Sequence, residues 1–306
     1  ADSNEATGVK WAAASGGGGG ASMDSNSNFV VGTNAGNSLS GDESNNIFIG
    51  DEAGEDLNYG SSDGNIFIGY QAGKEADYYG NTFIGNKAAK SVTGVSLNNV
   101  VIGGTAGQNY TSISSSVIIG GQAAGGTEAA CNNNVIIGRN AGKNAYMQNV
   151  FIGTECGKNL SNDPFYITAV GKSAVENAQG TVNLAAFGYQ TLRNNTTGAN
   201  NSCFGYQAGL NTNTGSDNTS IGYQAGDVIT TGDNNITIGK SADPSAADAD
   251  NEITLGNSSN DTIRCNTQTI SSLSDARDKT DIDQLKLGLD FVDSLKPVKF
   301  KWQTRD

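Results

Sequence analysis

The sequence predicts an all-β fold: an intertwined homotrimeric β-solenoid (β-roll) fibre of about 14 rungs, followed by a short C-terminal α-helix. Three observations lead to this prediction. A short signature recurs along most of the chain, Gly is abundant, and the pattern becomes helical near the C-terminus. With 42 Gly and 36% hydrophobic residues in 306 residues, one thick core is not expected.

The signature reads Asn, three residues of strand type, Gly, two variable residues, Ala and Gly. It occurs 14 times at intervals of 15 to 19 residues, and the last five intervals are all 17. The residue before the first Gly is apolar in every copy, Asn stands four before it in 10 copies, and Ala three after it in 11. Such regularity indicates a repeat architecture. The first glycines of the signature are Gly32, Gly50, Gly69, Gly85, Gly103, Gly120, Gly138, Gly153, Gly171, Gly188, Gly205, Gly222, Gly239 and Gly256.

Each part of the signature has a physical role. The β-branched and aromatic triplet, for example 47–49, favours a short strand. Gly permits a turn with positive φ, and Ala fits a crowded interior. Asn at one repeated position indicates either a stacked amide ladder or a local Asx-turn.

The centre of the triplet changes along the chain. It is Phe, Val or Ile from Phe48 to Phe151, and Ala, Cys, Ser or Thr from Ala169 to Thr254. We expect the early repeats to be covered on a side that the later repeats expose to water.

One strand and one Ala in 17 residues are too little to enclose a core within a single chain. Several chains wound around one axis would bury these residues, and three is the natural number. Short rungs stacked along such an axis give a long, thin fibre.

We divide the chain into a leader at 1–27, the repeat solenoid at 28–266 and a C-terminal segment at 267–306. The leader is either the end of an upstream segment or a flexible tail. Residues 271–306 hold 7 acidic and 7 basic side chains, so the net charge of −13 lies on the rest of the chain. An apolar spacing formed by Ile282, Leu285, Leu289 and Val292, with Thr280 as cap, predicts a helix that packs on sister chains.

The composition excludes several classes of function. Without His there is no Ser-His-Asp triad and no His-ligated metal, so we expect neither a metal nor a cofactor. The acidic charge argues against nucleic acid as a partner, and no apolar run is long enough for membrane insertion. We interpret the four cysteines as small buried free thiols rather than as disulfides or metal ligands. They are Cys131, Cys156, Cys203 and Cys265.

The repeats resemble those of trimeric autotransporter adhesins and, more closely, those of bacteriophage tail fibres, in the stretches 65–73, 201–209 and 218–226. The start of the chain, 9–20, resembles the end of an upstream segment of such fibres, which would make this a C-terminal piece of a longer protein. The resemblance implies a homotrimeric structural fibre in a virion tail, bound to other tail proteins and contacting a host glycan or outer-membrane receptor. The alternative is a bacterial surface adhesin or extracellular filament.

The segment 274–280, the helix after it and 295–302 together resemble the start of the S74 peptidases, the intramolecular chaperones of phage tailspikes and fibres. That family trimerises the fibre and then cuts itself off. The resemblance places the cut between Ser274 and Asp275, with Ser274 and Lys279 as a catalytic Ser-Lys dyad. A Lys with a lowered pKa can serve as the base for a Ser hydroxyl. The alternative is a plain turn before a capped helix, and because the sequence stops at Asp306, we expect self-cleavage to require the rest of that domain.

Other candidate sites are weaker. Tyr70, Tyr206 and Tyr223 share one rung position, where they form either an aromatic stripe for sugars or a stacked structural ladder. Acidic pairs such as Asp42-Glu43 do not recur at a fixed rung position, so they indicate solvated surface rather than glycosidase carboxylates. No conventional enzyme is therefore expected, apart from one self-cleavage by Ser274 and Lys279.

Overall fold

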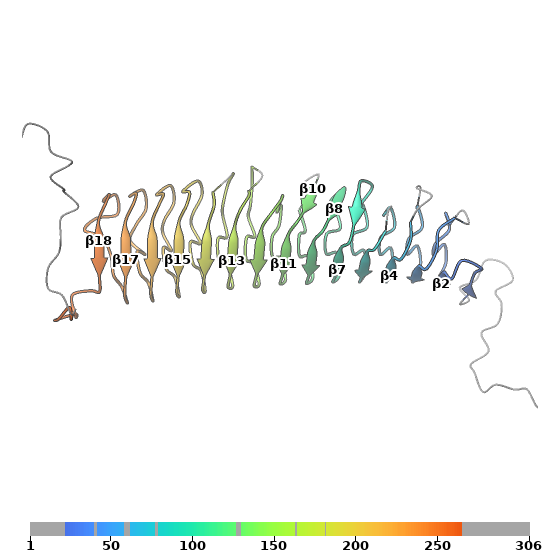
Figure 1. The fold of residues 1–306 in the computed structure, drawn as a ribbon, viewed down its shortest axis with the longest axis horizontal. Helices are drawn as coiled ribbons and strands as arrows, with labels where there is room; N and C mark the ends of the chain where they lie inside the picture. The colour runs from blue at the N-terminus through green and yellow to red at the C-terminus, as the bar shows by residue number, and fades with distance from the viewer. Residues whose placement is uncertain are drawn as a thin grey trace, which may run out of the picture. The chain divides into compact units, whose positions relative to one another are not determined.

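The computed structural model describes residues 22–39, 42–57, 62–76, 79–126, 130–162, 164–180 and 182–264. Within these ranges the chain forms an all-β solenoid of about 13 turns, without any helix (Figure 1). The solenoid belongs to the first of two compact units, Ala1–Asn260. The predicted C-terminal helix lies outside the described residues, so it stays a prediction.

One sheet runs the length of the solenoid. It has 15 strands in the order β1-β2-β3-β4-β5-β7-β9-β11-β12-β13-β14-β15-β16-β17-β18, and all neighbours pair in parallel except β1 and β2. The strand bounds are β1 Ser22–Met23, β2 Phe29–Val31, β3 Ile47–Ile49, β4 Ile66–Ile68, β5 Thr82–Ile84, β7 Val100–Ile102, β9 Val117–Ile119, β11 Val135–Ile137, β12 Val150–Ile152, β13 Thr168–Val170, β14 Ala185–Phe187, β15 Ser202–Phe204, β16 Thr219–Ile221, β17 Ile236–Ile238 and β18 Ile253–Leu255. Each signature thus forms one strand, as its spacing predicts.

A second sheet of three strands lies on the early coils. It consists of β6 Ser96–Leu97, β8 Ser112–Ser114 and β10 Ala130–Asn132, paired in parallel in the order β10-β8-β6. The central residues Ile113 and Cys131 are fully buried. This sheet was not predicted from the sequence, because its strands stand outside the signature.

The first Gly of the signature brings neighbouring coils together. Gly50 has φ +128°, and a Cβ at this residue would lie 2.6 Å from the carbonyl oxygen of Gly69 on the next coil. Any side chain would therefore collide with backbone. This contact explains why Gly recurs at every rung.

The repeated Asn forms the stacked ladder that its position indicates. Asn46 is fully buried, its Oδ1 accepts from the backbone N of Asn65 at 2.9 Å, and its Nδ2 donates to the carbonyl of Ser62 at 2.7 Å. Later coils have the same bonds: the backbone N of Asn235 donates to Oδ1 of Asn218, and Nδ2 of Asn218 donates to the carbonyl of Gly232. Each Asn therefore satisfies backbone groups of the next coil.

The core lies inside the single chain. Central strand residues, such as Phe48 and Phe67, point inward with no exposure, and Ala53 of the signature is equally buried. The Phe67 ring stacks between those of Phe48 and Phe83, with centroids 5.1 and 4.9 Å away. The expectation that several chains are needed to enclose a core is therefore wrong.

The expectation that the later repeats expose a covered side is wrong for the central strand residue. Ala169, Ala186, Cys203, Ser220 and Thr237 are at most 1% exposed, so the central residue points inward in the later coils too. The change from large to small residues therefore happens inside the core and does not mark a surface.

The core compensates for two of these small residues, Ala169 and Ala186, at the position four after the first Gly. Beside most large central residues this position is Gly, and beside Phe83 and Ile118 it is Ala. A Cβ on Gly157 would lie 2.6 Å from the ring of Phe151. In the coils with Ala169 and Ala186 the same position carries Val175 and Leu192, both fully buried. In these coils a larger residue at this position thus fills the space that a small central residue leaves.

Candidate functional site

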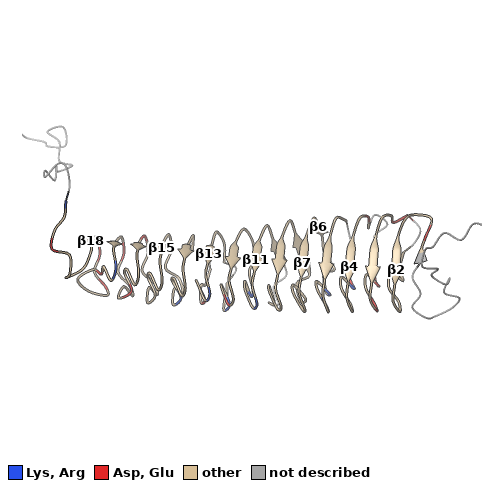
Figure 2. Ribbon diagram, turned by 90° about the horizontal axis from the view of Figure 1, so that it is seen from below, with Lys and Arg blue, Asp and Glu red and all other residues tan. Residues whose placement is uncertain are grey.

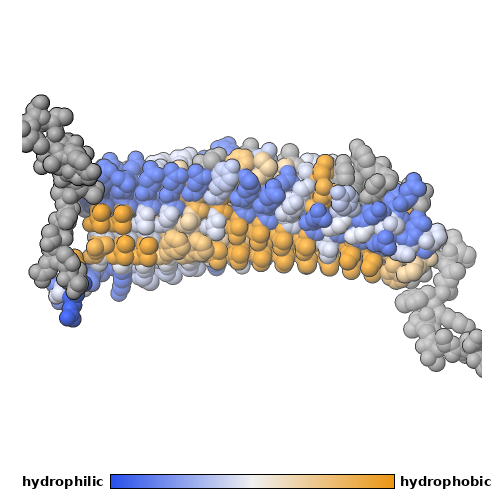
Figure 3. Space-filling model, viewed as in Figure 1, coloured by the Kyte–Doolittle hydropathy of each residue, from blue (hydrophilic) through white to orange (hydrophobic). Residues whose placement is uncertain are grey.

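The outward face of the long sheet is mostly apolar, and its polar members are Thr82, Thr168, Ser202 and Thr219 at the first strand position. It consists of the first and third residues of each three-residue strand, which we call the outer apolar face (Figure 3). No charged residue stands in the strands β2 to β18 of this sheet. The third residues are Val31, Ile49, Ile68, Ile84, Ile102, Ile119, Ile137, Ile152, Val170, Phe187, Phe204, Ile221, Ile238 and Leu255.

None of these third-position side chains is buried in the single chain. They are half-buried from β2 to β13 and exposed from β14 onward, reaching 53% at Leu255. Contiguous apolar surface of this extent marks an interaction face. The sequence contains a signal for this apolar face, because the residue before the first Gly is apolar in all copies. Side chains alternate along a strand, so when the central residue points inward the residue before the Gly points outward.

Aromatic side chains form two adjacent stacks near β14 to β16. Phe187 and Phe204 stack at 5.0 Å between ring centroids. Tyr206 stacks on Tyr189 at 5.2 Å and on Tyr223 at 5.1 Å, with planes within 16° of parallel. Their ring faces cover one another, as in a stacked ladder.

The structure brings together only two of the three Tyr residues proposed as a stripe. Tyr206 and Tyr223 stand on neighbouring coils, whereas Tyr70 lies on an early coil, and both Tyr70 and Tyr206 are 42% exposed. Tyr189 completes the stack instead. The repeat position would have identified it, but Thr191 replaces the Ala that defined the predicted stripe.

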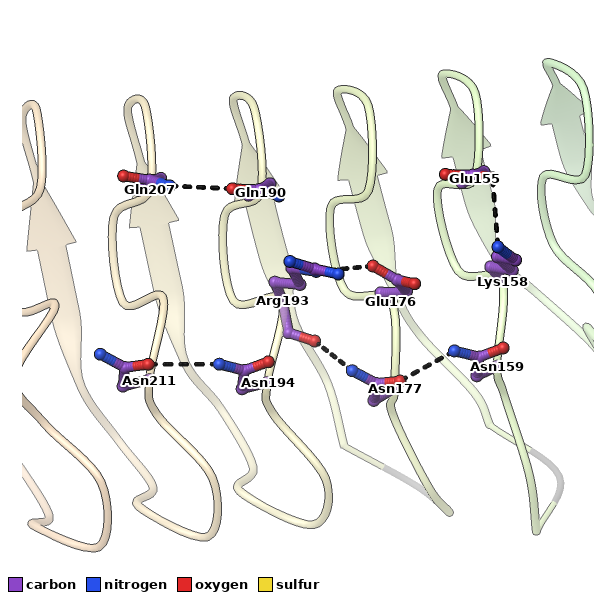
Figure 4. Close-up of polar contacts among 10 residues, drawn as sticks. All are labelled: Glu155, Lys158, Asn159, Glu176, Asn177, Gln190, Arg193, Asn194, Gln207 and Asn211. Atoms are coloured by element: carbon purple, nitrogen blue, oxygen red, sulfur yellow. Dashed lines mark hydrogen bonds and ion pairs between the residues drawn. The ribbon is translucent and has the colours of Figure 1, made fainter.

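The opposite side of the coils carries rows of polar side chains, which we call the polar face. Figure 4 shows these rows on the coil segments that lie in front of the strands. Gln207 donates from Nε2 to Gln190 at 2.8 Å, and Asn194 donates from Nδ2 to Asn211 at 3.2 Å. Basic residues stand mainly along the edge of the coils away from the strands (Figure 2). The two long faces thus differ sharply in polarity.

Ion pairs link neighbouring coils on the polar side. Arg193 Nε lies 2.7 Å from Glu176 Oε2, and Lys74 Nζ lies 2.6 Å from Glu52 and 2.8 Å from Glu55. The hydrogen bond from Lys74 lowers the pKa of Glu52, and the bonds to both carboxylates raise the pKa of Lys74 well above its ordinary value. The carboxylates engaged here pair with cations of neighbouring coils, and such surface pairs make at most a modest contribution to stability.

The described cysteines are buried free thiols, as predicted. Burial raises the pKa of the Cys131, Cys156 and Cys203 thiols to about 12, so they are not nucleophiles at neutral pH. Cys265 lies outside the described residues. In the described part of the chain, no group of three or more Cys, Asp or Glu side chains is placed to hold a metal ion. Within the same ranges no helix has the length and hydropathy needed to span a membrane.

The predicted cleavage residues Ser274, Asp275 and Lys279 also lie outside the described residues, so their geometry is untested. The comparisons with known proteins address this part of the sequence. No curated protein and no solved structure matches the chain. Residues 274–306 match the family model of the chaperone of endosialidase, peptidase S74. A β-solenoid followed by a chaperone-of-endosialidase segment fits a tail-fibre-like protein.

Proposed function

We propose that this chain is one subunit of a homotrimeric fibre in which the outer apolar faces of three copies meet along the fibre axis. The observation that carries the proposal is the uninterrupted uncharged surface of 14 parallel strands. A sheet apolar on both sides is normally covered on both sides. Because each chain already encloses its own core, the copies would pack side by side rather than share a core.

The number three is supported by the C-terminal segment. Residues 274–306 match a chaperone family, and the S74 chaperones that the sequence resembles trimerise their fibres. The heptad-like spacing of Leu285, Leu289 and Val292 adds an apolar stripe suited to packing between sister helices.

The proposed role is mechanical and adhesive: a virion tail fibre that reaches a host surface and contacts a glycan or an outer-membrane receptor. The polar face supports this role, since it would point outward from a trimer and remain accessible. A bacterial surface adhesin built from the same repeats is the second candidate, supported by the resemblance of the repeats to trimeric adhesins.

We further propose that Ser274 and Lys279 carry out a single self-cleavage between Ser274 and Asp275. The match of the family model begins at Ser274, which supports the placement of the cut. In a longer precursor that contains this sequence, wild type should be cut after Ser274, and Ser274→Ala should block the cut. An uncut wild-type precursor would remove this part of the proposal.

The packing of the faces is tested by a charge placed on the outer apolar face. Ile137→Lys puts an ammonium at the middle of the sheet, where a sister chain would leave it buried and unpaired. We expect the full-length variant to lose the trimer while its far-UV circular dichroism stays that of wild type. The control Gln190→Lys, on the polar face, should remain trimeric. A trimeric Ile137→Lys variant would refute the assignment of this face.

A further inference from the structure

A hollow interrupts the rows of the polar face between the coils that begin at Gly103, Gly120 and Gly138. Its volume is about 280 Å³. Thr105, Gln122 and Asn140, each two residues after the first Gly of its coil, line it together with Gln108, Asn109 and Lys143. We call it the polar notch.

The notch exists because one coil lacks a side chain. Gln108 and Lys143 stand five residues after the first Gly of their coils, and Gly125 stands at the same position of the coil between them. Gly125 therefore leaves a gap one coil wide in the row of side chains at this position.

The hydrogen-bonding groups of the notch are free to bind a ligand. No hydrogen bond joins the six polar side chains of the notch to another described residue. At matching positions elsewhere, Gln190, Gln207 and Gln224 are bonded to one another. Lys143 likewise makes no ion pair with a described carboxylate, unlike Lys158 and Lys74.

The lining selects a class of ligand. Four amides and one hydroxyl offer donors and acceptors side by side, which suits the hydroxyl groups of a saccharide. One cation and no carboxylate among the lining residues favour a ligand with a single negative charge. One cation is too few for a nucleic acid backbone, and the polar lining does not suit an apolar ligand.

We propose that the polar notch binds a saccharide unit that carries a carboxylate. Lys143 pairs with the carboxylate, and the amides of Gln122 and Asn140 hold neighbouring hydroxyl groups. This binding rests on the host contact proposed above, for which it specifies the class of glycan. The notch lies on the polar face, so three copies joined by their outer apolar faces would leave three such sites open.

The backbone allows a clean test. Gln122 and Asn140 have φ +58° and +57°, a left-handed conformation that Gly adopts without strain. Gln122→Gly and Asn140→Gly therefore remove the side chain and leave the coil intact. Asn34→Gly is a matched control, because Asn34 also has φ +57° but stands on the first coil, away from the notch.

The experiment is calorimetric titration of the full chain with trigalacturonate and 3′-sialyllactose as acidic probes, and with lactose, acetate and inorganic phosphate as comparators. We expect at least one acidic saccharide to bind. Each Gly variant of the notch should weaken its binding about threefold to tenfold. Lys143→Gln should abolish the preference for the acidic probe over lactose, and Asn34→Gly should bind as wild type does.

Three results would overturn the proposal: no binding of either acidic probe, equal binding of acetate or phosphate, or equal weakening by Asn34→Gly. Sedimentation of the same samples separates this site from the fibre. A trimer without binding would refute the notch alone. A monomer that still binds an acidic probe would support the notch and refute the fibre.

Discussion

The exchange of volume inside the coils predicts that two destabilising substitutions rescue each other. Ala169→Phe gives its coil the large central residue of the Phe151 coil, and Val175→Gly gives it the Gly that accompanies that residue there. A Cβ on Gly157 would lie 2.6 Å from Phe151, so a Phe at 169 and the native Val175 do not fit together. The two changes should therefore be compatible only in combination.

The expected magnitudes follow from packing. Ala169→Phe alone overfills the coil and should cost about 1–3 kcal/mol. Val175→Gly alone removes three buried carbons, at about 0.8 kcal/mol each, and leaves a cavity. It also releases a β-branched residue from φ +47°, which returns about 1–2 kcal/mol. Its net cost should be about 1–2 kcal/mol.

The double variant should lie within about 1 kcal/mol of wild type, which gives a coupling energy of roughly 2–3 kcal/mol in a double-mutant cycle. Urea unfolding followed by circular dichroism measures all four proteins. Ala169→Phe with Leu192→Gly is the control, because Leu192 packs one coil further on and should give no rescue. If the double variant loses the sum of the stabilities lost by Ala169→Phe and Val175→Gly, the two positions do not compensate each other, and this description of the core is wrong.

Three further predictions follow from the bonds between coils. Asn218→Ala should cost about 2–5 kcal/mol in urea unfolding, because the Gly232 carbonyl and the Asn235 N–H each lose a buried partner; a cost below 1 kcal/mol would contradict the ladder. Glu52 has a lowered pKa, so its bond to Lys74 stabilises the fold above the ordinary pKa of 4.5 and this contribution is lost as pH falls through the lower folded value. Glu52→Gln should therefore lower the urea midpoint at pH 6 and have a diminishing effect towards pH 3, and the same effect at both values would contradict the assignment. Iodoacetamide at pH 8 should leave the described thiols unmodified in the native protein and label them in urea, as read by peptide mass spectrometry, and native labelling would contradict their burial. These thiols are Cys131, Cys156 and Cys203.

The strands, the turn at each Gly, the buried Ala and the Asn ladder could be predicted because they repeat at one spacing. The direction of the central residue could not be predicted in the same way. In a triplet such as 47–49 all three residues are apolar, so periodicity alone does not say which side is the core. The pairing of Phe151 with Gly157, and of Ala169 with Val175, would have given the direction, but it requires comparing two positions of the repeat at once.

The candidate surfaces were predicted less completely. Stacking of Tyr206 on Tyr223 follows from an interval of 17 residues, and the ladder interpretation anticipated it. The polar notch was not predicted, because its residues differ in type and the hollow depends on a missing side chain at Gly125. The apolar residue before each Gly was noticed as a strand signal, but its outward direction required the inward direction of the central residue.

In the proposed fibre, three closed solenoids pack by their outer apolar faces. The most direct measurement is the mass of the full wild-type chain in solution by sedimentation equilibrium over a range of concentrations. One chain has a mass of 31.4 kDa, so the account predicts a single species of three times that mass, about 94 kDa. A folded species that stays at 31.4 kDa at all concentrations would contradict it.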